Sequence, residues 1–173
     1  MSDISKEKLV EILDQYLYGW GFVDILKATG GYEGAKLAGF ILGACFIDAL
    51  AGFYAGVNKD ESKNGSGKRF KDFIKIYLTQ YDADELWEDL RCGLVHSYAA
   101  GKTYGFTDSR TTPFGFHLSM TPQGQILLNL EDFLSEIRKA YGDFRSDILK
   151  DNEVFEKAKR RFLSMGLMAP VTY

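Results

Sequence analysis

A run of 21 residues, from Leu37 to Val57, contains a single charged side chain, that of Asp48. As a helix this run is roughly 31 Å long, which is enough to cross a bilayer. Two features instead favour a buried helix in a soluble protein. Nine of the 21 residues are Gly or Ala, and a carboxylate near the middle of a membrane span costs about 2.5–3.5 kcal/mol. The run therefore predicts the central helix of a bundle, with membrane insertion as the weaker alternative.

Length and composition favour a single soluble domain over residues 1–173. Apolar residues make up 46% of the chain and aromatic residues 14%, which excludes a disordered chain. The N-terminus is polar, and Cys45 and Cys92 lie among apolar residues, so we expect a cytoplasmic protein with free thiols. A net charge of −3 excludes a broadly basic surface for nucleic acid, although not a local basic patch. With two His and two Cys, we expect no metal site and no cofactor.

Apolar residues recur at helical spacing along most of the chain, which predicts a mainly α fold with four to six helices. Gly19 and Gly21 are expected to interrupt or bend the first helix, and Gly39 and Gly43 to let neighbouring helices approach the central one. Caps are expected at Asp82 or Asp84 and at Asn129. The expected helices cover residues 5–30, 32–56, 70–81, 82–101, 129–148 and 154–165.

The apolar spacing changes from helical to alternating between residues 114 and 130. Two alternating runs are separated by Pro122-Gln123-Gly124, which predicts a β-hairpin inserted before the last two helices. A short additional strand is expected over residues 103–107. The alternating residues are Phe114, Phe116, Leu118 and Met120 in the first run and Ile126, Leu128 and Leu130 in the second.

Two segments imitate catalytic motifs without completing them. The segment 64–69 is similar to the end of a phosphate-binding loop, but Ser62 stands where Gly is required and Arg69 where Ser or Thr is required. His117 shares one face of the predicted hairpin with Ser119, but nothing nearby is expected to orient its imidazole. We therefore expect neither segment to be catalytic and His117 to lie on the hairpin surface.

A more informative pair is Arg91 and His96, on a helix that otherwise faces the core. In an α-helix these residues are about 140° apart around the axis and 7.5 Å along it, so they converge on one phosphate only if a second copy crosses nearby. Arg can hold a phosphate, and His can transfer a proton near neutral pH. With RNA the 2′-OH supplies the nucleophile, so the pair suits phosphodiester cleavage without metal. In the structural alternative Arg91 only pairs with Asp48 or Glu88.

The segment from Arg91 to Tyr98 resembles the HEPN superfamily (higher eukaryote and prokaryote nucleotide-binding domains). The mark of this family is Arg, four to six residues and then His on a bundle helix, and Arg-x4-His-x-Tyr looks like the form found in prokaryotic toxin members. The helix around Asp48 is similar to the packing helix of such domains, so the resemblance covers roughly residues 37 to 100. It implies an HEPN-like bundle that forms a homodimer and brings two Arg91/His96 pairs into one cleft.

Active members of this family are metal-independent endoribonucleases, often toxins or anti-phage effectors. On this resemblance Arg91 binds the scissile phosphate of an RNA substrate and His96 is the general acid/base, with Asp48 and Cys92 as supporting residues. Tyr98 matches a position that a partner nucleotidyltransferase modifies in one toxin branch, so such an antitoxin is an expected partner. The family usually has a polar residue in place of Cys92, which donates only weakly. The alternative function is therefore a non-catalytic HEPN-like module that binds nucleotide, RNA or a protein partner.

Overall fold

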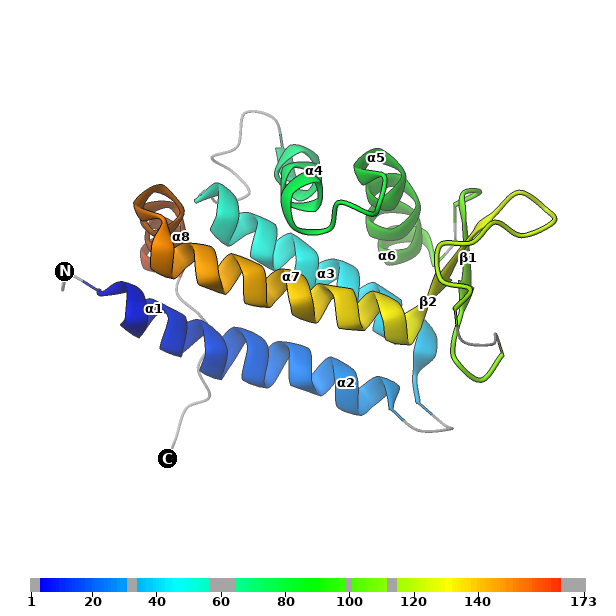
Figure 1. Cartoon of the computed structure of the whole chain (residues 1–173), viewed down its shortest axis with the longest axis horizontal. Helices are drawn as coiled ribbons and strands as arrows, with labels where there is room; N and C mark the ends of the chain where they lie inside the picture. The colour runs from blue at the N-terminus through cyan, green and yellow to red at the C-terminus, as the bar shows by residue number, and fades with distance from the viewer. Residues whose placement is uncertain (1–3, 31–33, 57–64, 99–100, 112–114, 166–173) are drawn as a thin grey trace.

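The computed structural model describes residues 4–30, 34–56, 65–98, 101–111 and 115–165, and within this part of the chain it contains six helices and two short strands (Figure 1). The first helix is continuous through α1, η1 and α2, and the fourth through α5, η2 and α6. The helical bounds are α1 Lys6–Ile12, η1 Leu13–Phe22, α2 Val23–Thr29, α3 Lys36–Ala55, α4 Gly65–Tyr77, α5 Ala83–Glu85, η2 Leu86–Leu94, α6 Val95–Ser97, α7 Leu130–Lys150 and α8 Asn152–Met165. The mainly α prediction is confirmed.

The apolar run forms α3, which contacts α2, α4, η2, α7 and α8 and is the centre of the bundle. Figure 1 shows α7 beside the first helix, with α8 at one end of the bundle and the strands at the other. Two glycines make the packing on α7 close: a Cβ at Gly39 would lie 2.9 Å from Leu130, and one at Gly43 would lie 3.0 Å from Phe133. A side chain there would overpack the core, so the expected role of these glycines is confirmed.

Among the described residues, α3 is the one helix long and apolar enough to cross a membrane, with a mean hydropathy of 1.8 over its best window. More than half of that window is buried inside the bundle. Phe40, Ala44, Ile47 and Leu50 on this helix are at most 2% exposed. This burial fits the core helix of a soluble protein.

Local signals place several helix ends correctly. The side chain of Asp82 accepts hydrogen bonds from the backbone N–H groups of Asp84 and Glu85, and Asn129 caps α7 in the same way through Asp132. Gly56, with φ 70°, ends α3 in the left-handed conformation. The break expected at Gly19 and Gly21 is absent from the described helix, because the chain continues there through the π-helical segment η1.

The fourth helix also ends earlier than expected. Its last residue is Ser97, and Tyr98 follows with a φ of 51°, so the stop predicted at Gly101 was wrong. Gly101 instead lies against the buried carboxylate of Asp89, which accepts the N–H groups of Thr103 at 2.7 Å and Tyr104 at 3.1 Å. This contact joins the fourth helix to the first strand.

The predicted hairpin is only partly correct. The second run forms β2 (Ile126–Asn129), but its partner in the sheet is β1 (Tyr104–Thr107), which runs parallel to it with Tyr104 opposite Ile126. The first run makes one antiparallel bridge, from Met120 to Ile126, and Leu118 and Ser119 exchange backbone hydrogen bonds with Leu127. The start of this run at Phe114 lies outside the described residues. Leu118 has a φ of 60°, which interrupts an extended strand. Met120 is 72% exposed, so little apolar burial stabilises an extended strand in this run.

A buried carboxylate follows β1 and fixes the turn there. Asp108 accepts hydrogen bonds from the N–H groups of Arg110 and Thr111 at 3.0 and 3.1 Å, and from Arg110 Nε at 2.9 Å. The hydrogen bond from Arg110 is the main reason that the pKa of Asp108 falls to about 2. The ionised carboxylate therefore stabilises the fold above its ordinary pKa of 3.8, and this contribution is lost as the pH falls toward 2.

We expect Asp108→Asn to lower the free energy of unfolding by about 1–2 kcal/mol at pH 7, because the amide cannot accept from all of these donors at once. The difference between variant and unmodified protein should shrink as the pH falls from about 4 toward 2. Urea unfolding at a series of pH values measures the loss of stability at pH 7 and its change with pH. A difference that stays constant down to pH 2 contradicts the assigned pKa.

Candidate active site

The helix that carries Arg91 and His96 changes from α to π geometry over η2. The N–H of Val95 reaches the carbonyl of Leu90, five residues earlier, so a residue lies close to the one five positions along instead of four. Arg91 Nη1 is accordingly 3.2 Å from His96 Nε2. The predicted 140° separation was wrong because it assumed α geometry. Single π turns are frequent at functional sites.

Asp48 on α3 holds Arg91 in place. Its Oδ2 accepts from Arg91 Nε at 3.3 Å and Nη2 at 3.1 Å, while its Oδ1 accepts from Arg69 Nε at 3.4 Å and Nη2 at 3.1 Å. The exposed fractions of the three side chains are 13% for Asp48, 18% for Arg91 and 8% for Arg69. Of the two partners considered for Arg91, the structure selects Asp48. The carboxylate ties α3 to both α4 and η2.

His96 and Tyr98 extend this cluster to the protein surface. A guanidinium only donates hydrogen bonds, so His96 Nε2 accepts from Arg91 and the ring proton is assigned to Nδ1. His96 is exposed, and Tyr98 is 75% exposed at the end of the helix. The guanidinium carbon of Arg91 lies 5.9 Å from the ring centroid of Trp87, which supports its other side. The pair thus lies between a buried carboxylate and solvent.

The thiol that follows Arg91 stays neutral. Burial and, next, the carboxylate of Glu88 raise the pKa of Cys92 against the opposing effect of Arg91 and Lys71. A neutral thiol is a weak hydrogen-bond donor. Cys92 therefore adds little polarity to the site.

Cys45 lies one helical turn before Asp48, and its pKa depends on the charges of the cluster. Burial is the main reason that its pKa is raised, Arg91 opposes that rise and Asp48 adds to it. We therefore expect Asp48→Asn to lower the pKa of Cys45 and Arg91→Met to raise it further. The pH dependence of alkylation by iodoacetamide measures this pKa, since the thiolate is the reactive form.

A Cys92→Ser background leaves Cys45 as the single thiol of the chain, so the alkylation rate refers to one residue. Lys68→Met, on a surface pair with Asp72, serves as a charge control. Shifts of the same sign in Asp48→Asn and Arg91→Met would contradict the geometry described for the cluster.

His117 occupies a different environment from the one predicted. It lies in a turn, its side chain is 10% exposed, and three groups orient its ring. Nδ1 accepts the N–H of Asn129 at 3.0 Å, while Nε2 lies 3.0 Å from the Tyr81 hydroxyl and 3.2 Å from Glu136 Oε2. The expectation of a surface histidine with nothing to orient it was wrong. With both ring nitrogens engaged, His117 joins the 115–121 turn to α7.

The sequence contains two short basic stretches, residues 68–71 and 157–161, and most of their lysines are paired with carboxylates. In the first, Lys68 pairs with Asp72 at 2.5 Å and Lys71 with Asp84 at 2.6 Å. In the second, Lys157 pairs with Glu153 at 2.7 Å. Such exposed pairs contribute little to stability and leave little uncompensated charge for RNA. Among the paired cations of the first stretch, only Arg69 reaches the Arg91 cluster in the part of the chain that the structure describes.

Arg69 is the member of the cluster that the sequence analysis missed. Residues 69, 73 and 77 share one face of α4, where Arg69 and Phe73 are buried. An arginine on a buried face needs a partner, and Asp48 is the single charge of the apolar run. These two signals together could have paired Arg69 with Asp48.

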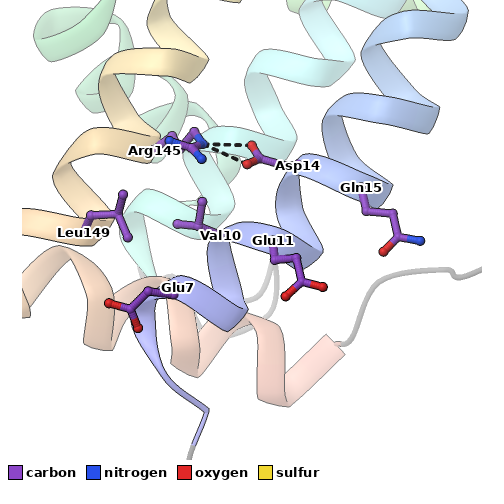
Figure 2. Close-up of a pocket in the computed structure, with 7 residues that line it drawn as sticks. All are labelled: Glu7, Val10, Glu11, Asp14, Gln15, Arg145 and Leu149. Carbon is purple, nitrogen blue, oxygen red and sulfur yellow. Dashed lines mark hydrogen bonds and ion pairs between the residues drawn. The ribbon is translucent and has the colours of Figure 1, made fainter.

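A cavity of about 570 Å³ lies far from these residues in the fold, between the first helix and α7 (Figure 2). Arg145 contributes to it but is bound by Asp14, whose oxygens lie 3.0 and 2.8 Å from Arg145 Nε. Three carboxylates against one guanidinium make this cavity unsuitable for a phosphate. The lining residues are Glu7, Val10, Glu11, Asp14, Gln15, Arg145 and Leu149.

Within the described residues, no three His, Cys, Asp or Glu side chains gather as a metal-ion site. No family model matches the sequence, and neither a curated protein nor a solved structure matches it. The candidate site therefore depends on its own geometry: an arginine and a histidine are in contact at the surface, and the partly buried Asp48 orients the arginine.

Proposed function

We propose that this chain is a metal-independent endoribonuclease of the HEPN type, acting in the cytoplasm as a toxin or defence protein. The observation that carries the proposal is the 3.2 Å contact between Arg91 Nη1 and His96 Nε2 at an exposed helix end. Asp48 binds Arg91 through Nε and Nη2, so Nη1 is left to the exposed His96. This arrangement unites a phosphate-binding group and a proton-transfer group.

The reaction needs two proton transfers. The 2′-OH of RNA attacks the adjacent phosphorus and gives up its proton, the P–O5′ bond breaks, and the leaving 5′-oxygen takes a proton. The products are a 2′,3′-cyclic phosphate and a 5′-OH. Arg91 stabilises the charge that develops on the phosphoryl oxygens. One His96 can accept the first proton, and the His96 of a second copy can supply the other.

An exposed apolar face of α3 is the observation that favours a homodimer. Leu37 is 43% exposed and Leu42 is 41% exposed, about 140° apart around the helix axis, and the exposed Cys45 points between them. This face runs along α3 toward Asp48 and therefore toward Arg91. A homodimer that covered it would place its two Arg91/His96 pairs near the same interface, which is the composite cleft that the proposal requires.

The test is cleavage of RNA by the full chain in the presence of EDTA. We expect products that end in 2′,3′-cyclic phosphate, recognised by a mass 18 Da below that of the linear phosphate, since ring closure excludes one water. A DNA oligonucleotide of the same sequence is the control and should stay intact, because it lacks the 2′-OH. Intact RNA at a stoichiometric amount of protein overturns the proposal.

Tyr98 is the residue through which we propose that a partner controls the nuclease. Its side chain is 75% exposed, and it follows His96 by two residues at the end of the same helix. A nucleotidyl group added to its hydroxyl by an antitoxin would bring negative charge and bulk to the site, and both would exclude an RNA phosphate.

A non-catalytic binding module is the second candidate function. Cys92 favours it, because the raised pKa keeps this thiol neutral and a weak donor beside Arg91. Such a module would bind nucleotide, RNA or a protein partner through Arg91 without turnover. Binding of RNA that is lost in Arg91→Ala, with no cleavage product from the unmodified protein, identifies this function.

A further inference from the structure

Arg69 is a deeply buried cation whose hydrogen bonding is incomplete. It is 8% exposed, and it reaches Asp48 Oδ1 through Nε and Nη2. Its third nitrogen, Nη1, is the one buried side-chain nitrogen or oxygen of the described residues with no hydrogen-bond partner. A buried charged donor without a partner costs free energy, so a packing role alone is a poor reason for an arginine here.

The charges of the cluster do not cancel. Asp48 carries one negative charge, and Arg69 and Arg91 carry one positive charge each, so the three together have a net charge of +1. The nearest lysines of α4 do not change this sum, because Lys68 and Lys71 are paired with Asp72 and Asp84. The carboxylate divides its two oxygens between the arginines, one oxygen to each.

We propose that Arg69 is a positioning residue of the phosphate site and acts through Asp48. It neutralises the carboxylate that orients Arg91, so Arg91 is held in place yet keeps its charge for a phosphodiester. This inference rests on the proposed function only in taking a phosphodiester as the ligand of Arg91. Without Arg69, Asp48 and Arg91 form a neutral pair, and a phosphate must compete with the full charge of the carboxylate.

Because each oxygen of Asp48 binds a different arginine, the carboxylate keeps one cationic partner when a ligand binds Arg91. When a phosphate binds Arg91 and weakens its hydrogen bonds to Asp48, Oδ1 of the carboxylate remains bound to Arg69. Nη1 of Arg69, which has no partner, can then donate to the carboxylate as well. The hydrogen bonds from Arg91 to Asp48 regain their full strength when the phosphate leaves.

Binding of a labelled oligonucleotide made entirely of 2′-O-methyl ribonucleotides tests the proposal. This probe has the RNA phosphates but no free 2′-OH, so it cannot be cleaved. We expect Arg69→Met to weaken binding by about tenfold, which is the effect of one charge a few ångströms from the ligand at the protein surface. Fluorescence anisotropy at low salt measures the dissociation constant.

The double variant Arg69→Met/Asp48→Asn separates charge from structure. It returns the cluster to a net charge of +1, so we expect its affinity to lie within about threefold of that of the unmodified protein. Lys68→Met removes a charge from the same helix but from a surface pair, and it should change the affinity by less than about twofold. Thermal unfolding of each variant confirms that it is folded.

Three results overturn the inference: Arg69→Met binds as tightly as the unmodified chain, the double variant binds no better than Arg69→Met, or the unmodified chain does not bind the probe. The proposed nuclease fails by a different result. Binding of the probe without cleavage of the matching RNA removes the nuclease activity but leaves the role of Arg69 intact.

Discussion

We expect His96→Ala to lower the rate of the proposed RNA cleavage by about 10²–10⁴-fold, which is the contribution of a general acid/base. The histidine is exposed, and within the described residues it hydrogen-bonds to Arg91. The free energy of unfolding of the variant should therefore differ from that of the unmodified protein by less than about 0.5 kcal/mol, as is usual for surface substitutions. Single-turnover cleavage in EDTA and urea unfolding measure the two quantities on the same sample.

Two controls make this result specific to proton transfer. Ser97→Ala changes the exposed neighbour of His96 and should cleave RNA at the unmodified rate. His117→Asn removes the ring that joins Asn129, Tyr81 and Glu136, so it should lower the stability and spare the cleavage rate of the folded fraction. Unchanged cleavage by His96→Ala would exclude it as the acid/base, and loss of cleavage in folded His117→Asn would transfer that role.

The bundle was predictable because its signals are local. The apolar run defines α3, its glycines mark where α7 approaches, and the side chains of Asp82 and Asn129 cap the next helices. The hairpin was only partly correct because strand pairing is not local. The two runs flank a turn, yet β2 pairs with a strand that begins 22 residues earlier, at Tyr104. An alternating apolar pattern indicates that one face of a strand is buried, but it does not identify the neighbouring strand to which the hydrogen bonds are made.

Three residues of the Arg91 cluster could be selected from the sequence, but their geometry could not. Arg91 and His96 were selected by their chemistry and by the resemblance of their spacing to a family motif, and Asp48 is the single charge of the apolar run from Leu37 to Val57. The contact between the pair depends on the π turn, which leaves no composition signal in Leu86–Leu94. The position of His117 depends on Glu136 and Tyr81, which are distant in sequence and meet only in the folded chain.

Asp48→Ala should be the most destabilising change in the cluster, lowering the free energy of unfolding by about 3–5 kcal/mol. It removes the acceptor of Arg69, which is 8% exposed, and of Arg91 together. The two like charges of Arg69 and Arg91 then have no carboxylate between them. The loss is a large part of the 5–15 kcal/mol that holds a typical domain together. Urea unfolding at neutral pH measures it.

Asp72→Ala is the matched control, because Asp72 pairs with Lys68 on the surface of α4 and its side chain is 41% exposed. It should cost less than about 1 kcal/mol. If the two variants lose the same stability, the burial of Asp48 is not what makes it important. Adding Arg69→Met to Asp48→Ala should recover part of the loss, since the buried cation is then gone. An apolar helix can carry one carboxylate at its centre only if cations meet it there, and the two that do so are Arg69 and Arg91 of the candidate site.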